Sequence, residues 1–280
     1  MDLMIRQFCD WDIDFAVAQT IREGWDNTVS TFRVCLSHDP EGCFIAETDG
    51  QRVGMITTTR YVHSAWVGNL IVAPQYRCQR IGERLMKHAI GQLEARGIRT
   101  LWLEADPLGV NIYRRLGFVE QFKSSWFKKS PPHTATRSGT ERLHASDLEV
   151  ARTLDMLCFS DDRGKLLGEF LSVAHDAYCV RDDRRLVGFA MALPSATGVR
   201  LGPCVVSDPS AAGQLVDSVL SNFPDKTVVM GVPGVNRTAT QLAESRGFAR
   251  RLSSIRMLRG KAGAANATHR IVALANGAMG

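Results

Sequence analysis

The 280-residue sequence lacks any run of 18 apolar residues, and residues 1–12 contain no apolar core as long as that of a signal peptide. A helix needs about 20 predominantly apolar residues to cross a bilayer, and a secretory leader needs an apolar core after its start. We therefore expect a cytoplasmic protein with no membrane partner.

Patterns typical of metal sites and disulfide frameworks are also missing. The seven cysteines are an odd number, and none forms a CxxC pair or the Cys/His spacing of zinc ligands. Most lie in apolar segments, where free thiols behave as small hydrophobic side chains. We expect reduced core thiols, as is usual in the cytoplasm, and no metal.

The chain has no block of like charge. It contains 34 Lys and Arg against 29 Asp and Glu, a net charge of +5, but no basic run of five or six residues. A nucleic-acid surface is usually recognised by such a cluster, whereas an anionic small ligand explains the mild excess as well. We expect no nucleic-acid partner. The 45% hydrophobic content is that of a soluble globular protein, and the length suits two domains.

What the sequence does contain is an ordered series of strand and helix patterns in residues 1–130. Apolar spacing at Ile81, Leu85, Ala89 and Leu93 predicts a helix, which Gly97 suits as a cap. The pattern predicts strands at 3–8, 43–48, 52–59, 65–72, 99–105 and 118–128, and helices at 12–22, 29–36, 81–96 and 108–116.

Residues 69–96 are the most informative stretch. An apolar strand ends at Val72, a turn runs from Arg77 to Gly82, and an amphipathic helix follows. Such a turn directs several backbone N–H groups and the positive end of a helix dipole at one point, which suits a bound phosphate. The stretch therefore predicts a phosphorylated cofactor.

Three stretches in this order, NLIVAPQYR…IG, LWLEA and IYRRLGF, resemble the motifs of the GCN5-related N-acetyltransferase (GNAT) superfamily. The resemblance implies an α/β fold, a mixed sheet flanked by helices, and acetyl-CoA as the cofactor. In that family the fourth strand binds the pantetheine arm by its backbone, in the manner of an added strand, and the next turn binds the pyrophosphate. The implied cofactor-binding residues are Leu70, Ile71, Val72, Arg77, Cys78, Gln79, Arg80, Ile81, Gly82 and Asp106.

The turn departs from the family's Arg-x-x-Gly-x-Gly pattern. Arg80 stands at the first Gly position, and Cys78 stands where Gly is also frequent. A missing glycine matters only where φ is positive or the ligand touches Cα, and we expect a helix N-terminus to need neither. Arg80 either adds charge toward a phosphate or belongs with Arg84 to a solvated helix face. Asp106 replaces the usual Asn before the last helix, where we expect it to cap the helix.

The resemblance also implies catalytic residues. Tyr113 stands where the family's thiolate-protonating Tyr stands, although a helix Tyr can also pack on the sheet with its hydroxyl in water. Glu104 is the candidate base for the amine proton, because TLWLE resembles the corresponding strand of the ribosomal-protein alanine acetyltransferases. A Glu at a strand end is otherwise often exposed.

Four residues are candidates for the lining of the acceptor pocket. The alternative for a Trp in a loop after a helix is that its ring anchors the local core. They are Trp25, Asp26, Asn27 and Trp66.

Residues 131–140 are poor in apolar groups and rich in Pro, Ser and Thr, which predicts a linker between a cofactor-binding catalytic domain, 1–130, and a second domain, 141–280. The two parts repeat each other. The second copy has no Arg-x-x-Gly-x-Gly turn, and Ala243 stands at the position of Tyr113. The matching segments are 44 and 178, 53–55 and 187–189, 68–72 and 202–206, and 116–118 and 246–248.

Over nearly its whole length the chain resembles the YitH-like two-domain acetyltransferases, in which the second domain is a degenerate GNAT fold. The resemblance implies tandem GNAT folds and acetyl transfer to a primary amine of a small molecule or peptide by direct attack, in a monomer or homodimer. A non-catalytic acyl-CoA-binding regulatory module remains the alternative. The acceptor is not predicted, because loops that differ between members of a fold determine it.

Overall fold

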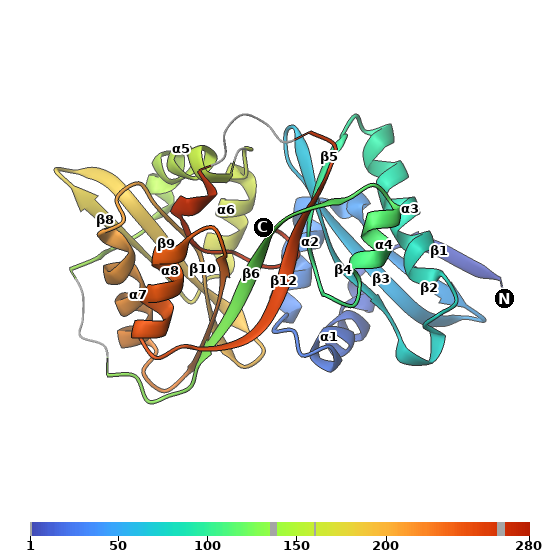
Figure 1. Cartoon of the computed structure of the whole chain (residues 1–280), viewed down its shortest axis with the longest axis horizontal. Coiled ribbons are helices and arrows are strands. Elements are labelled where there is room, and N and C mark those ends of the chain that lie inside the picture. The colour runs from blue at the N-terminus through green and yellow to red at the C-terminus, as the bar shows by residue number, and fades with distance from the viewer. Residues whose placement is uncertain (1, 135–138, 160, 262–266) are drawn as a thin grey trace.

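The computed structural model describes residues 2–134, 139–159, 161–261 and 267–280, and its elements follow the predicted order closely (Figure 1). The first half contains β1 (Leu3–Gln7), α1 (Ile13–Arg22), α2 (Val29–His38), β2 (Cys43–Thr48), β3 (Gln51–Arg60), β4 (Ser64–Val72), α3 (Ile81–Ala95), β5 (Thr100–Ala105), α4 (Val110–Arg115) and β6 (Val119–Lys129). The second half contains β7 (Glu141–Arg142), α5 (Leu148–Phe159), α6 (Gly164–Val173), β8 (Asp176–Asp182), β9 (Arg185–Ser195), β10 (Gly198–Val206), α7 (Ala211–Asn222), β11 (Thr227–Pro233), α8 (Arg237–Ser245), β12 (Ala249–Arg259) and β13 (Ile271–Ala273).

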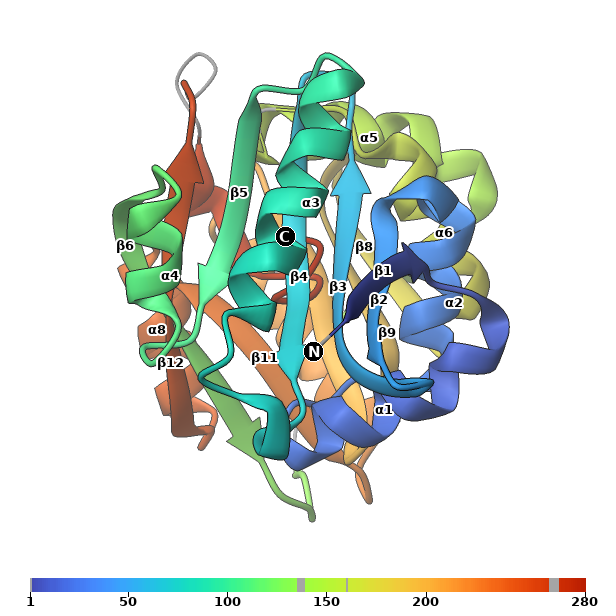
Figure 2. The same ribbon diagram turned by 90° about the vertical axis from the view of Figure 1, so that its right-hand side faces the viewer.

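The described strands form one continuous mixed sheet with helices on its faces, which confirms the predicted fold class. Its order is β1-β2-β3-β4-β5-β12-β6-β11-β10-β9-β8-β7, with β13 paired to β10. In the first half α3 packs across β3 and β4, whereas α1 and α2 lie on the opposite face (Figure 2). The apolar stripe predicted for α3 is buried against the sheet.

Local turn signals act as predicted. Asp49 and Gly50 both have positive φ, at 48° and 73°, and connect β2 to β3 in a tight hairpin. Gly97 has a φ of 81° after the last turn of α3, a backbone conformation that glycine adopts at little cost.

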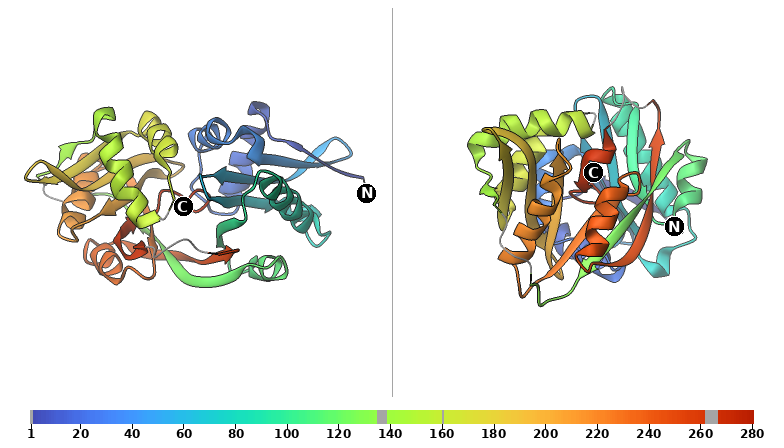
Figure 3. Two further views of the ribbon diagram at one scale, coloured as in Figure 1. Left: turned by 90° about the horizontal axis from the view of Figure 1, so that it is seen from above. Right: turned by 60° about the vertical axis from the view of Figure 1, so that its left-hand side comes forward.

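The halves exchange one strand each, β6 of the first half and β12 of the second. β12 pairs with β5 and places Arg256 opposite Glu104, while β6 pairs with β11 and places Trp126 opposite Gly231. The two exchanged strands pair with each other in the middle of the sheet, where they join the two halves (Figures 1 and 3). The boundary near residues 131–140 therefore separates chain segments but not sheets.

Part of the predicted linker, residues 135–138, lies outside the described residues. On its near side His133 is fixed to the second half: its N–H donates to the Pro224 carbonyl at 3.1 Å, and its Nε2 lies 2.8 Å from the Lys226 carbonyl. The division into domains 1–130 and 141–280 stays a prediction about the sequence.

Three apolar cores hold the sheet and helices together. One core lies under α3 in the first half and a second lies under α7 and α8 in the second half. The third is shared, because side chains of α1, α2, α5 and α6 meet between the halves. Large members of the shared core are Phe8, Phe32, Trp66, Phe159, Phe170 and Phe189. Shared burial of this kind ties the stability of each half to the other.

The sequence repeat is visible in equivalent hydrogen bonds. After α4 the Phe118 N–H donates to the Tyr113 carbonyl at 3.1 Å, and after α8 the Phe248 N–H donates to the Ala243 carbonyl at 3.0 Å. Gly117 and Gly247, at φ values of 85° and 76°, end the two helices in the same way. The structure thus pairs Tyr113 with Ala243, as the sequence comparison predicts.

All seven cysteines are free thiols, and all but Cys9 and Cys78 are buried. Burial raises the pKa of Cys35 to about 12. Across the ranges given above, no helix combines the length and apolar character needed to cross a membrane.

Candidate active site

The site begins where two neighbouring parallel strands separate. β4 and β5 pair only from Ser64 to Trp66, opposite residues 100–102, and then diverge. Within the described chain, residues 67–72 of β4 have no ladder partner on the side that faces β5. An unpaired strand edge of this kind can accept an extended, amide-rich ligand as an added strand.

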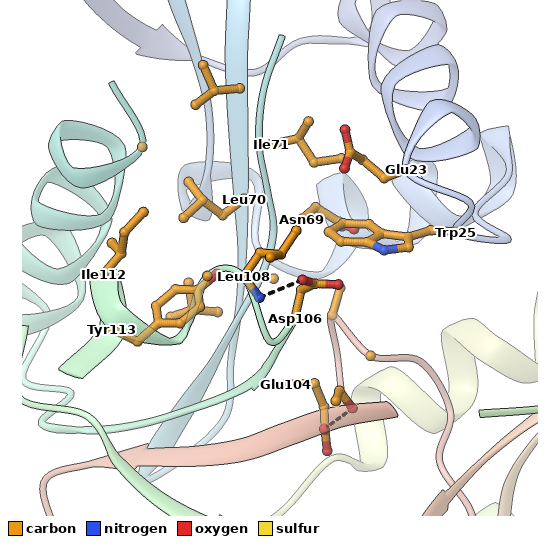
Figure 4. A pocket seen from close by; sticks show the side chains of 18 of the residues that line it. Glu23, Trp25, Asn69, Leu70, Ile71, Glu104, Asp106, Leu108, Ile112 and Tyr113 are labelled. Atoms are coloured by element: carbon orange, nitrogen blue, oxygen red, sulfur yellow. Dashed lines mark hydrogen bonds between the residues drawn. The ribbon is translucent and has the colours of Figure 1, made fainter. Parts of the chain in front are cut away.

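A bulge re-aims β4 at this point. The β3–β4 register shifts between Met55 and Thr57, and Asn69 in the facing stretch adopts a φ of 50°. β-Bulges bend a strand and change which way its groups point. Leu70 and Ile71 follow the bulge and lie along the cavity (Figure 4).

A cavity of about 620 Å³ occupies the space between the separated strands. Both candidate catalytic residues and most predicted ligand-binding residues line it, including Tyr113, Glu104, Leu70, Ile71, Val72, Arg77, Cys78, Arg80, Ile81, Gly82, Asp106, Trp25, Asp26 and Asn27. Gln79 and Trp66 are the two predicted site residues that do not.

The turn before α3 presents a row of free amide groups. Arg84 N–H donates to the Arg80 carbonyl at 3.0 Å, but among the described residues nothing accepts from the N–H groups of 78–83. Because these groups lie at a helix N-terminus, they form a ready site for an anion. Gln79 belongs to the turn, but its side chain is exposed and outside the cavity.

The expectation that the turn needs no positive φ is wrong. Cys78 and Arg80 adopt φ values of 63° and 60°, at the two positions where the family pattern favours glycine. A side chain in this left-handed region costs about 1–2 kcal/mol. The family's glycines therefore have a conformational reason, and this chain forms the same turn without them.

The arginines of this region have different roles. Arg77 donates from Nε to the Val72 carbonyl at 2.9 Å and pairs with Glu23, so its side chain braces the end of β4. Arg84 donates to the Leu3 carbonyl at 3.1 Å, so its guanidinium is fixed to the start of β1. Arg80 is exposed, lines the cavity and pairs with no described residue. Arg80 immediately precedes α3 and Arg84 lies in its first turn. Of these two, only the Arg80 side chain is free to contact a ligand.

Tyr113 lies on α4 and faces the cavity across from Trp25 (Figure 4). Its ring packs edge-on against Phe118 at 6.1 Å, and no hydrogen bond joins its hydroxyl to any described residue. Burial, with a smaller contribution from the Asp106 carboxylate, raises the pKa of Tyr113 well above its ordinary value. The phenol therefore stays protonated at neutral pH.

Asp106 lines the cavity, but it does not cap α4 as expected. Its carboxylate accepts from the Leu108 N–H at 2.9 Å, within the loop (Figure 4), and α4 begins only at Val110. An Asx-type turn before the helix explains the difference, because Asp side chains readily bond a backbone amide two residues on.

Glu104 is held tightly by the exchanged strand. Its carboxylate accepts from Arg256 at 2.7 Å, from Ser254 at 2.5 Å and from Ser124 at 2.9 Å, and its side chain is only 2% exposed. A carboxylate has about four lone-pair sites, so three donors leave little capacity for a substrate proton. Two of the three donors, Arg256 and Ser254, belong to β12 of the second half.

The predicted acceptor residues separate into two groups. Trp25, Asp26 and Asn27 form a loop after α1 that lines the cavity. Trp66 is wrong as a pocket residue, because it is 1% exposed and lies in the shared core. Its Nε1 donates to the Gly277 carbonyl at 3.0 Å, and Arg256 stacks 4.3 Å from its ring. Its strand position is the physical reason, because its side chain packs into the shared core, where its ring stacks on Phe159 at 6.0 Å.

A chain of buried amides fixes this wall. Asn69 donates to Thr57 at 3.0 Å, Asn27 donates to Asn69 at 2.9 Å, and Asn276 donates to Asn27 at 3.0 Å. Networks whose members are all satisfied rigidify a buried region. The β4 bulge, the loop after α1 and the C-terminal segment are thereby held as one unit.

The second half contributes cavity residues that the sequence analysis missed: Arg200, Leu252, Ser253, Ser254, Asn276, Gly277 and Ala278. Only Arg200 had a signal, a lone charge inside the apolar strand GVRLGPCVV. The rest belong to exchanged or C-terminal segments whose position depends on distant pairing.

The equivalent opening in the second half is filled by the chain itself. β10 and β11 pair from 198 to 200 and then separate, but β13 pairs with β10 at Val205 and Gly231 of β11 bridges to Leu274. Asn236 donates to the Ile271 carbonyl at 2.9 Å and holds the inserted strand. The space that is open in the first half is therefore occupied in the second. No group of three or more potential metal ligands occurs in the part of the chain described.

Comparisons with known proteins agree with this geometry. Residues 5–118 match a family model described as "Acetyltransferase (GNAT) family", and residues 151–273 match one described as "Acetyltransferase (GNAT) domain". The chain is 35% identical over 75 residues to "[Ribosomal protein bS18]-alanine N-acetyltransferase" of Escherichia coli K12, a match over 26% of this chain and 51% of that protein. It is 29% identical over 99 residues to "N-alpha-acetyltransferase 30" of Dictyostelium discoideum, over 33% of this chain and 54% of that protein. The chain thus spans about half the length of these curated relatives.

Two solved structures share the whole architecture. A putative acetyltransferase from Pyrococcus horikoshii superposes with a TM-score of 0.85 at 20% identity, over 99% of this chain and 96% of that one. A tandem GNAT protein from the clavulanic acid biosynthesis pathway superposes with a TM-score of 0.64 at 17% identity, over 95% of this chain and all of that one. At these identities the likeness is one of fold.

Proposed function

Because the chain belongs to the GNAT acetyltransferases, with one GNAT fold in each half, we propose that it transfers the acetyl group of acetyl-CoA to a primary amine in the cavity of the first half. The observation that carries the proposal is the unfilled gap between the separated strands β4 and β5, which ends at the unpaired amides of 78–83. In the second half the same opening is filled by β13. The first half is thus proposed as the catalytic unit.

The cofactor fits these groups by their chemistry. The free edge of β4 at Leu70 and Val72 would bond the amides of the pantetheine arm, and the amides of 78–83 would hold the pyrophosphate, with Arg80 supplying added charge. Acetyl-CoA supplies the thioester carbonyl that the amine attacks.

Tyr113 is proposed as the acid that protonates the departing thiolate. Its raised pKa keeps the proton on the phenol at neutral pH, and its hydroxyl is not engaged by another described side chain. Direct attack also requires that the attacking amine lose a proton. Glu104 remains the candidate base, and its three hydrogen bonds favour a relayed role through water over direct contact with the amine.

One observation favours the alternative of a non-catalytic acyl-CoA-binding module. Glu104 is committed to Arg256 and two serines, which is also what a purely structural carboxylate would show. The acceptor side then would serve recognition rather than chemistry.

The test measures CoA binding by calorimetry and thiol release from acetyl-CoA with amines, amino acids, polyamines and short peptides. We expect binding together with acceptor-dependent thiol release. CoA binding without turnover on any acceptor would favour the binding module, and absence of CoA binding would remove both functions.

A further inference from the structure

Arg200 of β10 is a charged side chain without a partner in a buried position. The residue is 6% exposed and lines the cavity, and no hydrogen bond or ion pair joins its guanidinium to any residue of the described ranges. Burial lowers the pKa of Arg200, while the Asp26 carboxylate acts in the opposite sense. Since a guanidinium stays protonated in proteins, the protein retains a buried positive charge with five donors.

The acidic groups of the cavity are already occupied by other donors. Asp26 accepts from the Thr197 hydroxyl at 2.8 Å, Glu23 pairs with Arg77, and Glu104 pairs with Arg256. Asp26 lies close enough to influence Arg200 but forms no ion pair with it. Leaving a buried charge unpaired is costly, so the missing partner is expected to come from outside the chain.

The setting of Arg200 places it on the acceptor wall. The loop after α1 is tied to the β9–β10 turn, since the Ala196 N–H donates to the Asp26 carbonyl at 3.2 Å and Thr197 bonds the Asp26 side chain. Arg200 follows three residues later on β10. The phosphate-binding turn, by contrast, opens α3 in the first half (Figure 1).

We propose that Arg200 binds a carboxylate of the acceptor, so that the second half supplies a specificity-determining residue and the substrate is a small amine that also bears a carboxylate. The inference rests on the proposed acetyl transfer. Arginine suits this role because its planar fork matches a carboxylate in two parallel hydrogen bonds. The amine of the same molecule would then lie toward the thioester, with the carboxylate end anchored away from it.

The experiment compares wild type, Arg200→Met and the control Arg185→Met, in which an exposed arginine of the neighbouring strand is changed in the same way. Thiol release from acetyl-CoA is measured with α-, β- and γ-amino acids, each beside its amide. We expect wild type to prefer the acids. Arg200→Met should lower kcat/KM for the acids by about ten- to a hundredfold, the scale of hydrogen bonds to a charged group, and leave the amides and the Kd of CoA unchanged.

A second measurement separates this inference from the proposed function. Calorimetry follows binding of the same acids and amides to CoA-saturated protein. Binding of the acids that is lost in Arg200→Met supports a carboxylate site at Arg200 even if no amine is acetylated. In that case the proposed acetyl transfer is wrong, but the carboxylate site is not. Turnover without preference for acids, an equal loss for acids and amides, or absence of any acid binding and acid turnover overturns the inference.

Thermal unfolding tests whether Arg200 has only a structural role. Replacing an unpaired buried charge by an apolar side chain of similar length should leave Tm unchanged or raise it. A lower Tm for Arg200→Met than for Arg185→Met would overturn the inference, because it would assign Arg200 a stabilising contact within the fold.

Discussion

Glu104 and Arg256 illustrate how single residues connect the two halves. Arg256 lies on a strand of the second half, yet its guanidinium bonds the carboxylate at the floor of the first half's cavity and stacks on Trp66 and Phe122. Both side chains are nearly inaccessible, at 5% and 2% exposure. Breaking such a buried pair leaves a lone charge, which is much more costly than the pair itself is stabilising.

We therefore predict that Arg256→Met lowers the free energy of unfolding by about 3–5 kcal/mol. The double variant Glu104→Gln/Arg256→Met should lose clearly less than the sum of the single variants, because neither charge is then left alone. Urea unfolding of the four proteins measures the coupling. Additive losses would show that the two side chains do not depend on each other.

A second prediction at this scale concerns Tyr113. Tyr113→Phe removes only the hydroxyl, so turnover should fall roughly ten- to a thousandfold, the range of lost general-acid catalysis, while the Kd of CoA stays the same. Because the pKa of Tyr113 is raised, its proton remains bound through neutral and mildly alkaline pH, and the kcat profile should show no loss of this acid there.

Steady-state kinetics and calorimetry check the Tyr113 prediction. Tyr178→Phe is the matched control, since the Tyr178 hydroxyl donates to Asp176 in the second half at 2.8 Å, and its turnover should equal that of wild type. If Tyr113→Phe also equals wild type, the acid is a different group or water.

Among the elements, the turn before α3 combines a common architecture with uncommon residues. Cys78 and Arg80 accept the left-handed backbone so that the amides of 78–83 converge at the start of the helix. Conformational strain of this kind persists at sites where the geometry serves binding.

We predict that Cys78→Gly and Arg80→Gly each stabilise the protein by roughly 0.5–1 kcal/mol, since relief of the strained φ exceeds the added entropy of glycine in the unfolded chain. Gln79→Gly is the control, because Gln79 does not have a positive φ, and it should destabilise. The urea concentration at the midpoint of unfolding is compared for wild type and the three variants, provided that their m-values are equal. Equal destabilisation by all three glycines would mean that the turn stores no strain.

The elements also show how far sequence reasoning reaches. Helical spacing in α3, the Asp49-Gly50 turn and the LWLEA strand are local signals, and they placed these elements within a residue or two. The family's glycine positions contained the information that φ is positive at residues 78 and 80, although this sequence has no glycine there. The ion pair of Arg256 could not be predicted, because it depends on strand pairing between residues about 150 positions apart. The cavity position of Arg200 could not be predicted either, because it depends on the contact of the β9–β10 turn with the distant loop after α1.

For the whole molecule, the exchange of β6 and β12 changes what counts as a domain. Each half completes its sheet with a strand of the other, and α1, α2, α5 and α6 bury a common core. Neither half therefore has a complete core or a complete sheet of its own.

This predicts a single cooperative unfolding transition for the intact chain. Tryptophan fluorescence, which reports mainly on Trp25, Trp66, Trp102 and Trp126, should change together with far-UV circular dichroism in urea. Two separated transitions, or an intermediate in which only one probe has changed, would show that the halves fold as independent units.

The inserted strand β13 fills, in the second half, the gap that stays unfilled between β4 and β5 in the first half. A repeated segment whose own opening is filled could ordinarily be lost without harm to the other copy. Here the second copy supplies Arg256 beneath the first copy's cavity and Arg200 in the cavity wall, and its tail Asn276–Ala278 closes that wall. Loss of the second copy would remove these parts of the first copy's cavity, so the two copies can only be kept together.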